Sequence, residues 1–383
     1  MKILVNAIPL SGLLTGISRC LRCLYLEMGR LPGVSVSYFT GTRVVSEMPP
    51  LAKSDRWIRT TASIWKLPDP IVFFLRCAHW LRYEYFLERE IRKGKFDLYH
   101  ETAFVPAKTK RIPVVYTIYD LSLISFRDKH PRERVWFHDF FFHRRIEYAS
   151  RILTISEFIK TEIVRMLGIS SNRISAVPLA PDQIFYPRES SVVKRVLKRL
   201  NLPDRYFLFV GSLEPRKNLN AIIQAMALQK DPLPLVMTGW VGWGDKFWMR
   251  EIDRLGLEKK VFMTGYVDDE TLAALYSGAR GFVYPSFYEG FGLPVLEAMA
   301  CGCPVVCANA ASLPEVVGDA AIRIDPHDAA ALARAMEDIA VNDQLHRSLT
   351  LKGLCRAKEF SWRKTAGQTL NVFEKAVAGY REP

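Results

Sequence analysis

The sequence predicts an α/β protein built from two doubly wound domains. The chain has 383 residues, which is more than one hydrophobic core usually holds. An alternation of apolar strands, polar loops and helices begins near residue 2 and begins again near residue 206. Prolines and charges crowd the stretch before the second series. We therefore expect domains at residues 1–185 and 205–360, a linker at 186–204 and a final helix at 361–383.

The first domain begins with an apolar strand at residues 2–7, a loop that contains glycine, and a helix at 16–29. The loop lacks the G-x-G-x-x-G fingerprint of dinucleotide-binding domains, which weakens an NAD interpretation. Ser156 is a typical N-cap for a later helix. The other strands expected in this domain lie at residues 34–40, 96–101, 112–120, 151–155 and 174–180.

Two of these strands end in polar pairs, His100-Glu101 and Tyr119-Asp120. Doubly wound sheets bind ligands at the carboxyl ends of their strands. We therefore predict that these four residues contribute to a ligand site in the first domain. His138 lies further along, in an aromatic segment, and such histidines more often pack or face solvent than bind a ligand.

The second domain begins with a strand at residues 206–211, and its loop carries Arg216 and Lys217 before Asn218, an expected N-cap. Arginine binds phosphate in a bidentate manner and lysine acts as a point charge, so the pair predicts a phosphate site. Asp268 and the next residue fit a helix start better than a metal site. The remaining strands are expected at residues 234–239, 261–265, 281–284, 304–307 and 322–324.

The loop after residues 281–284 combines acids with glycines. Glu289 precedes Gly290-Phe291-Gly292, and Pro294 and Glu297 follow at the start of an expected helix. The N–H groups of a first helical turn attract an anion, whereas carboxylates accept hydrogen bonds from hydroxyls. Hydroxyls beside a phosphate indicate a sugar nucleotide. Taken singly, either glutamate would more often be an ordinary solvated residue.

The stretch E-G-F-G-L-P followed by L-E-A-M-A-C-G-C-P-V-V, with seven residues between its two glutamates, resembles the signature of the retaining GT-B glycosyltransferases of family four. This resemblance implies two Rossmann-like domains that face each other across a cleft, with the last helix crossing back to the first domain. It also implies the donor-binding residues, which are Gly16, Arg216, Lys217, Val267, Glu289, Gly290, Phe291, Gly292, Leu293 and Glu297.

The resemblance also implies a catalytic set and an acceptor side. Glu289, Asp120, Lys217 and Arg216 form the expected catalytic set, in which the two cations neutralise the leaving diphosphate without a metal or another cofactor. The acceptor side comprises Tyr119, Asp120, His100 and Glu101. In this family, the strand end that corresponds to residues 119–120 more commonly carries the pair His-Asp. Tyr119 replaces that histidine, and a tyrosine cannot become a cation near neutral pH.

The formal charge of +13 also requires an explanation. Residues 53–95 interleave aromatic side chains with basic residues, a composition that suits an anionic lipid surface. A solvated face over an ordinary core helix would explain the same pattern. No common nucleic-acid module is visible. An apolar run at residues 71–81 is broken by Arg76, and the basic residues around it are Lys53, Arg56, Arg59, Lys66, Arg82, Arg89, Arg92, Lys93 and Lys95.

The cysteines and the N-terminus indicate a compartment. The chain has seven cysteines, mostly inside apolar segments, which favours buried thiols in a reducing compartment over a disulfide framework or zinc. The first residues lead directly into a strand and lack the features of a signal peptide. We expect a cytoplasmic protein, peripheral on the inner face of the cytoplasmic membrane if the basic stretch binds lipid.

The resemblance is nearest to bacterial transferases that build surface polysaccharide. It implies transfer of a hexose, with mannose from GDP-mannose favoured, to a glycan or a polyprenyl-diphosphate-linked acceptor in O-antigen or lipopolysaccharide synthesis. Two alternatives share the donor site, a sugar-nucleotide epimerase and a catalytically silent nucleotide-binding scaffold. A nucleic-acid-binding protein is suggested by charge alone.

Overall fold

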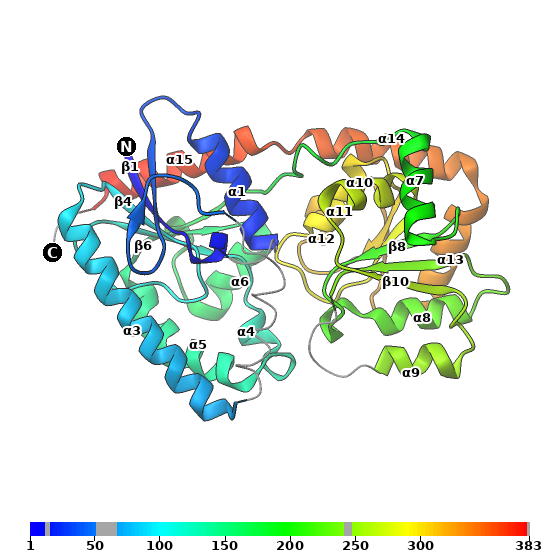
Figure 1. Cartoon of the computed structure of the whole chain (residues 1–383), viewed down its shortest axis with the longest axis horizontal. Helices are drawn as coiled ribbons and strands as arrows, with labels where there is room; N and C mark the ends of the chain where they lie inside the picture. The colour runs from blue at the N-terminus through cyan, green and yellow to red at the C-terminus, as the bar shows by residue number, and fades with distance from the viewer. Residues whose placement is uncertain (12–15, 51–66, 241–246, 381–383) are drawn as a thin grey trace. The chain divides into compact units, whose positions relative to one another are not determined.

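The computed structural model describes residues 1–11, 16–50, 67–240 and 247–380 (Figure 1). The chain forms two compact units. The first contains residues 1–179 and 362–383, and the second contains residues 180–361. Each unit is built on a parallel sheet, as the sequence predicts. Part of the expected glycine loop after the first strand, with residues 53–66 of the basic aromatic stretch, lies outside the described residues.

The sheet of the first unit has the order β3-β2-β1-β4-β5-β6-β7. All neighbouring strands are parallel except β3, which pairs antiparallel with β2. The two central strands β4 and β5 are buried along their whole length, as expected when helices cover both faces of a sheet. The strands are β1 (Lys2–Asn6), β2 (Ser35–Phe39), β3 (Val44–Val45), β4 (Leu98–Glu101), β5 (Val114–Ile118), β6 (Ala149–Thr154) and β7 (Ile174–Ala176).

The helices of the first unit include the one that the final segment contributes. Helix α15 (Trp362–Ala378) packs against α1 (Gly16–Met28), as Figure 1 shows, so the last segment does return to the first unit. Ser156 caps α6 (Glu157–Leu167) by accepting a hydrogen bond from the Ile159 N–H, as predicted. The other helices are η1 (Ile8–Ser11), α3 (Asp69–Lys93), α4 (Ser122–Ser125), η2 (Arg127–Lys129), α5 (Arg132–Arg145), η3 (Ile146–Tyr148) and η4 (Ser171–Arg173).

The sheet of the second unit has the order β10-β9-β8-β11-β12-β13, and all its pairs are parallel. The first strand, β8, lies between β9 and β11, so the strand order reverses between β8 and β11. Such a reversal is where doubly wound sheets bind their ligands. The strands are β8 (Phe207–Val210), β9 (Leu235–Thr238), β10 (Val261–Gly265), β11 (Gly281–Tyr284), β12 (Val305–Ala308) and β13 (Ile322–Ile324).

The prediction of a linker at residues 186–204 is wrong, because this segment contains helix α7 (Ser190–Leu200). Helix α7 packs against α10 (Asp269–Gly278) of the same unit. Charged residues cover its outer face, while Val193 and Leu197 are buried. Val192, Val196 and Leu200 are half-buried beside them, so apolar residues at helical spacing form the face that docks α7. The other helices of this unit are η5 (Pro215–Lys217), α8 (Leu219–Ala227), α9 (Phe247–Arg254), α11 (Leu293–Ala300), α12 (Leu313–Val317), α13 (Ala329–Val341) and α14 (Asp343–Lys358).

The structure also shows where the cysteines lie and whether a helix could span a membrane. Cys20, Cys23, Cys301, Cys303 and Cys307 are buried, as expected, whereas Cys355 is exposed. None of the helices in the described part of the chain has the length and apolar character needed to cross a membrane.

Candidate donor and acceptor sites

The basic pair and the acidic loop of the second unit meet where the strand order reverses. Arg216 and Lys217 follow β8, and Glu289 follows β11, the neighbouring strand. Lys217 Nζ donates to Glu289 Oε1 at 2.6 Å and to the Tyr284 hydroxyl at 2.8 Å. Arg216 Nη1 contacts Glu289 Oε2 at 3.4 Å. Three of the residues predicted to bind the donor are therefore in direct contact.

Glu214 completes this cluster of charges. Its Oε1 accepts a hydrogen bond from Arg216 Nη2 at 2.7 Å. Its Oε2 is buried and has no hydrogen-bond partner among the described residues. Two cations and two carboxylates thus balance one another, and one carboxylate oxygen stays available as an acceptor.

The electrostatics of the cluster keep Glu289 ionised. Burial alone would raise the pKa of Glu289, but Lys217 and Arg216 more than reverse this and hold the pKa at about 2. The Ser286 hydroxyl also donates to Glu289 Oε1, at 2.6 Å. Burial lowers the pKa of Lys217, against the attraction of Glu289. Glu289 is therefore a poor general acid near neutral pH and a good acceptor for hydroxyl groups.

Leu313, the first residue of α12, and Ser312 before it contact the glycine turn and hold it in place. Gly292 has φ 109°, and a Cβ placed there would lie 2.6 Å from Leu313 Cδ2. The Ser312 hydroxyl lies 2.9 Å from both the Glu289 and the Phe291 carbonyl oxygens. These contacts hold the turn at the N-terminus of α11, where the first N–H groups of the helix favour an anion.

The other predicted donor residues lie near the same edge of the sheet. Glu297 is buried on α11 and accepts a hydrogen bond from the Tyr276 hydroxyl at 3.3 Å. Val267 is half-buried in the loop after β10. Asn218 precedes α8 as predicted, but its side chain does not cap the helix. Its Nδ2 instead donates to the carbonyl oxygens of Pro285 and Pro326, which ties the β8 loop to the β11 loop.

His100 and Glu101 in the first unit lie in its interior. Both ring nitrogens of His100 have partners, the Tyr25 and Thr117 hydroxyls, and burial lowers its pKa to about 3. Burial raises the pKa of Glu101 to about 7, although it accepts hydrogen bonds from Asn6, Tyr99 and two backbone N–H groups. Their burial gives them a structural role and does not support the direct acceptor contact predicted for them.

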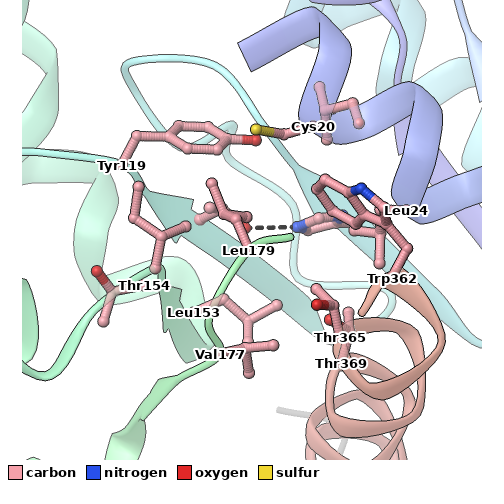
Figure 2. A pocket seen from close by; sticks show the side chains of 14 residues that line it. Cys20, Leu24, Tyr119, Leu153, Thr154, Val177, Leu179, Trp362, Thr365 and Thr369 are labelled. Carbon is pink, nitrogen blue, oxygen red and sulfur yellow. Dashed lines mark hydrogen bonds between the residues drawn. The ribbon is translucent and has the colours of Figure 1, made fainter. Parts of the chain in front are cut away.

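Tyr119 and Asp120 lie at the edge of the interior, where two small hollows form. Figure 2 shows the first hollow, in which the Tyr119 ring extends toward Cys20 and Trp362 lines the opposite side. Its volume is about 30 Å³, enough for a water molecule but not for a sugar ring. The second hollow, of about 40 Å³, is lined by both Asp120 and His138. Burial lowers the pKa of His138 to about 4, so this imidazole is neutral at pH 7.

The sequence prediction missed several residues of the donor cluster, namely Glu214, Tyr284, Ser286 and Ser312. Glu214 and Ser286 each lie within three residues of a predicted site residue, and that proximity is the signal that could have identified them. Gly16 begins α1 at an exposed position, and its contact with a donor stays a prediction. In the parts of the chain that the structure describes, no group of three histidine, cysteine or acidic side chains has a metal-binding arrangement.

Two family models match the chain. One describes glycosyl transferases group 1 and matches residues 194–353, and the other describes Glycosyltransferase Family 4 and matches residues 16–182. The first match contains the Arg216, Lys217 and Glu289 cluster, and the second contains Tyr119 and Asp120.

Individual proteins extend this similarity to the whole chain. O-antigen chain mannosyltransferase B of Escherichia coli is 35% identical, over 98% of this chain and 100% of that protein. MMP alpha-(1->4)-mannosyltransferase of Mycolicibacterium hassiacum is 29% identical, over 81% of this chain and 76% of that protein. The solved structure of sucrose-phosphate synthase from Thermosynechococcus elongatus matches with a TM-score of 0.74 at 20% identity, over 98% and 99% of the two chains, and this likeness concerns the fold.

Proposed function

The chain belongs to the GT-B glycosyltransferases of family four, and we propose that it transfers mannose from GDP-mannose to a glycan acceptor carried on a polyprenyl diphosphate. The family predicted from the E-G-F-G-L-P motif is thus confirmed. The enzyme is a retaining, metal-independent hexosyltransferase of polysaccharide synthesis. The choice of mannose is supported by the names of the full-length relative and of the second relative, both mannosyltransferases. The proposed place of action is the cytoplasmic face of the inner membrane.

One observation carries the proposed donor site, namely the contact of Arg216 and Lys217 with Glu289 where the strand order of the second unit reverses. A nucleotide-sugar diphosphate brings negative charge to this position, and the two cations and the N-terminus of α11 offer it compensation. Glu289 and Glu214 pair with the same two cations.

We infer the chemical step from these groups and from the retained configuration. The bond between the anomeric carbon and the β-phosphate oxygen breaks, and the acceptor hydroxyl oxygen bonds to that carbon on the same face. The hydroxyl proton passes to the departing phosphate oxygen, so the products are the mannosylated acceptor and GDP. Arg216 and Lys217 stabilise the charge that develops on the diphosphate. Glu289 stays ionised and accepts hydrogen bonds from sugar hydroxyls, a role that the unpartnered Glu214 Oε2 can share.

Asp120 and Tyr119 are the proposed acceptor-side residues. Both are only half-buried, in contrast to His100 and Glu101. Asp120 accepts a hydrogen bond from the Ser122 N–H at 2.9 Å through one carboxylate oxygen, Oδ1. The Tyr119 hydroxyl is held neutral because burial raises its pKa well above the usual value, so it can donate to a sugar oxygen.

Donor binding is the test we would run first. GDP-mannose, UDP-glucose, UDP-N-acetylglucosamine and dTDP-rhamnose are each added to the purified protein, and the melting temperature is measured with and without EDTA. We expect a selective stabilisation by GDP-mannose that EDTA leaves unchanged, because binding to the folded state raises its stability. Lys217→Met should abolish the shift, and Lys259→Met, at an exposed position of the same unit, should retain it.

The outcomes separate the rival functions. A shift with another nucleotide sugar would replace the proposed donor. Conversion of a sugar nucleotide without any acceptor would indicate an epimerase, and binding without turnover on any acceptor would indicate a scaffold. An absence of binding by all four compounds would refute the donor site itself.

A further inference from the structure

Helix α3 exposes an apolar stripe that turns basic along its length. Ile71, Phe74 and Leu75 lie on this stripe in the first half of the helix, and 68% of Phe74 is accessible to solvent. Arg82 and Tyr85 continue the stripe at helical spacing, and Tyr85 is 67% exposed. Large apolar side chains at consecutive turns of one exposed face are unusual for a surface that meets only water.

Helix α5 lies beside α3 and adds a second exposed stripe (Figure 1). Its members are spaced by four residues, with Arg132, Trp136, Phe140 and Arg144 all exposed. The Arg144 guanidinium lies over the Phe140 ring, 4.8 Å from its centre. Aromatic rings therefore occupy the middle of this stripe, and an arginine stands at each end.

Phe73 joins the two stripes into one surface. Its ring makes edge-to-face contacts with Phe74 on α3 and with Trp136 and Phe140 on α5, with ring centres 5.4, 6.4 and 6.2 Å apart. The exposed rings of both helices thus form one contiguous apolar patch. We call this surface the α3/α5 face; its apolar part is Ile71, Phe74, Leu75, Trp136 and Phe140, and its basic part is Arg82, Arg132 and Arg144.

The acids of the two helices leave this face positive. None of the four acids of α3 belongs to its exposed stripe, and three of them are paired, Glu84 with Arg145, Glu88 with Arg111 and Glu90 with Lys93. On α5, Glu133 is buried against Arg76 and Asp139 pairs with Arg127. The α3/α5 face therefore combines exposed rings and aliphatic side chains with cations that none of the described acids of α3 and α5 neutralises.

We propose that the α3/α5 face is a docking surface for an anionic lipid bilayer. Aromatic and aliphatic side chains insert at the level of the headgroups, and the long arginine side chains keep their guanidinium groups at the phosphates. The charge of the face matches an anionic membrane, to which each nearby cation adds attraction. A second copy of this chain is the other possible occupant, but it would bring the same cations against one another.

This inference extends the proposed function, whose lipid-linked acceptor requires the enzyme at a membrane. Its test is independent of the donor site, because lipid binding is measured without turnover. If GDP-mannose fails to bind while vesicles do, the proposed donor is wrong and the docking surface stands. If GDP-mannose binds and vesicles do not, the docking surface is wrong and the donor site stands.

The experiment is co-sedimentation of the purified full-length protein with vesicles of phosphatidylcholine, alone or mixed with phosphatidylglycerol. We expect binding to the mixed vesicles that weakens as salt is raised. The double variant Phe74→Ser, Phe140→Ser should bind at least tenfold more weakly. The double variant Arg82→Gln, Arg144→Gln should bind more weakly and with less dependence on salt.

Matched controls remove the same chemistry from the second unit. Leu228→Ser with Leu351→Ser replaces two exposed aliphatic residues, and Lys194→Gln with Arg195→Gln removes two exposed cations of α7. Both controls should bind as the wild type does. Equal loss in a variant and its control, no binding by the wild type to phosphatidylglycerol, or a dimer that the Phe74 and Phe140 changes dissociate without loss of lipid binding would each overturn the proposal.

Discussion

Glu289 has two roles, one in the charge balance of the donor cluster and one proposed in the chemical step. Its carboxylate is buried, so it needs nearby positive charge, and Lys217 and Arg216 supply it. Removing one partner of a buried ion pair typically costs about 3–5 kcal/mol, because the other charge is left buried without compensation. The same ion pair lies at the site proposed for the donor diphosphate, where Glu289 and the diphosphate would share the two cations. A change at this carboxylate should therefore affect stability and catalysis by separate routes.

We predict that Glu289→Gln lowers turnover by about 100-fold or more and also lowers the melting temperature. Glutamine has a similar shape but cannot balance Lys217 and Arg216, so GDP should bind at least as tightly as it binds the wild type. Steady-state kinetics gives turnover, and titration calorimetry gives the affinity for GDP.

Glu258→Gln is the control for this prediction, since Glu258 is an exposed glutamate of the same unit. It should leave stability, turnover and GDP affinity unchanged. Full turnover in Glu289→Gln would remove Glu289 from the catalytic set. Weaker GDP binding would show that this carboxylate supports the nucleotide rather than competing with it.

The glycine turn at the start of α11 is the element whose geometry the donor site depends on most. Gly292 combines a positive φ with a position where a Cβ would meet Leu313 at 2.6 Å. Gly256 also has a positive φ, but nothing lies within 4 Å of a Cβ placed there. A comparison of alanine substitutions at these two glycines therefore separates the cost of a positive φ from the cost of steric overlap.

We predict that Gly292→Ala costs more stability than Gly256→Ala. A left-handed backbone costs a non-glycine residue about 1–3 kcal/mol, and the overlap with Leu313 adds to this. Gly292→Ala should also weaken GDP-mannose binding about tenfold or more, because relief of the overlap moves the first N–H groups of α11. Denaturant unfolding and ligand titration measure the two effects. Equal losses of stability in both variants, or unchanged donor binding in Gly292→Ala, would contradict this account.

At the scale of elements, the sequence predicted the central strands well because their apolar runs are buried on both faces. It predicted the N-caps Ser156 and Asp268 because each satisfies a local rule, and each accepts the expected backbone hydrogen bond. Helix α7 was missed because the charged residues of its segment seemed to leave little to bury, although Val193 and Leu197 are buried. Its docking partner α10 lies far along the chain, but apolar residues at helical spacing from Val192 to Leu200 were a local signal for the helix that the prediction overlooked.

Long-range pairing also limited the prediction of the sites. Arg216, Lys217 and Glu289 were expected in one site from their loops, but the contact of Lys217 with Tyr284 depends on β8 and β11 lying side by side. In the first unit, Glu101 seemed accessible because it ends a strand. Asn6 at the end of the neighbouring strand β1 instead binds it in the interior.

At the scale of the whole molecule, the chain returns to its first unit after completing the second. Helix α15 supplies Trp362 and Phe373 to the interior of the first unit, where Phe373 contacts the ring of His100. The Thr365 hydroxyl also donates to the Pro178 carbonyl oxygen at 2.7 Å. Residues 180–361 form the second unit without any part of α15. The stability of the first unit should therefore depend on α15, and that of the second should not.

We predict that truncation after Ser361 unfolds the first unit and leaves the second folded. Loss of a buried Phe or Trp side chain costs about 3–5 kcal/mol each, against a total stability of about 5–15 kcal/mol for a domain. Calorimetry of the truncated chain should show one transition, smaller in enthalpy than that of the wild type, and GDP-mannose should still raise its temperature. Removal of residues 381–383 alone is the control and should leave the wild-type transitions. If truncation after Ser361 abolishes every transition, the second unit depends on the first for its folding, and the two units are one cooperative structure.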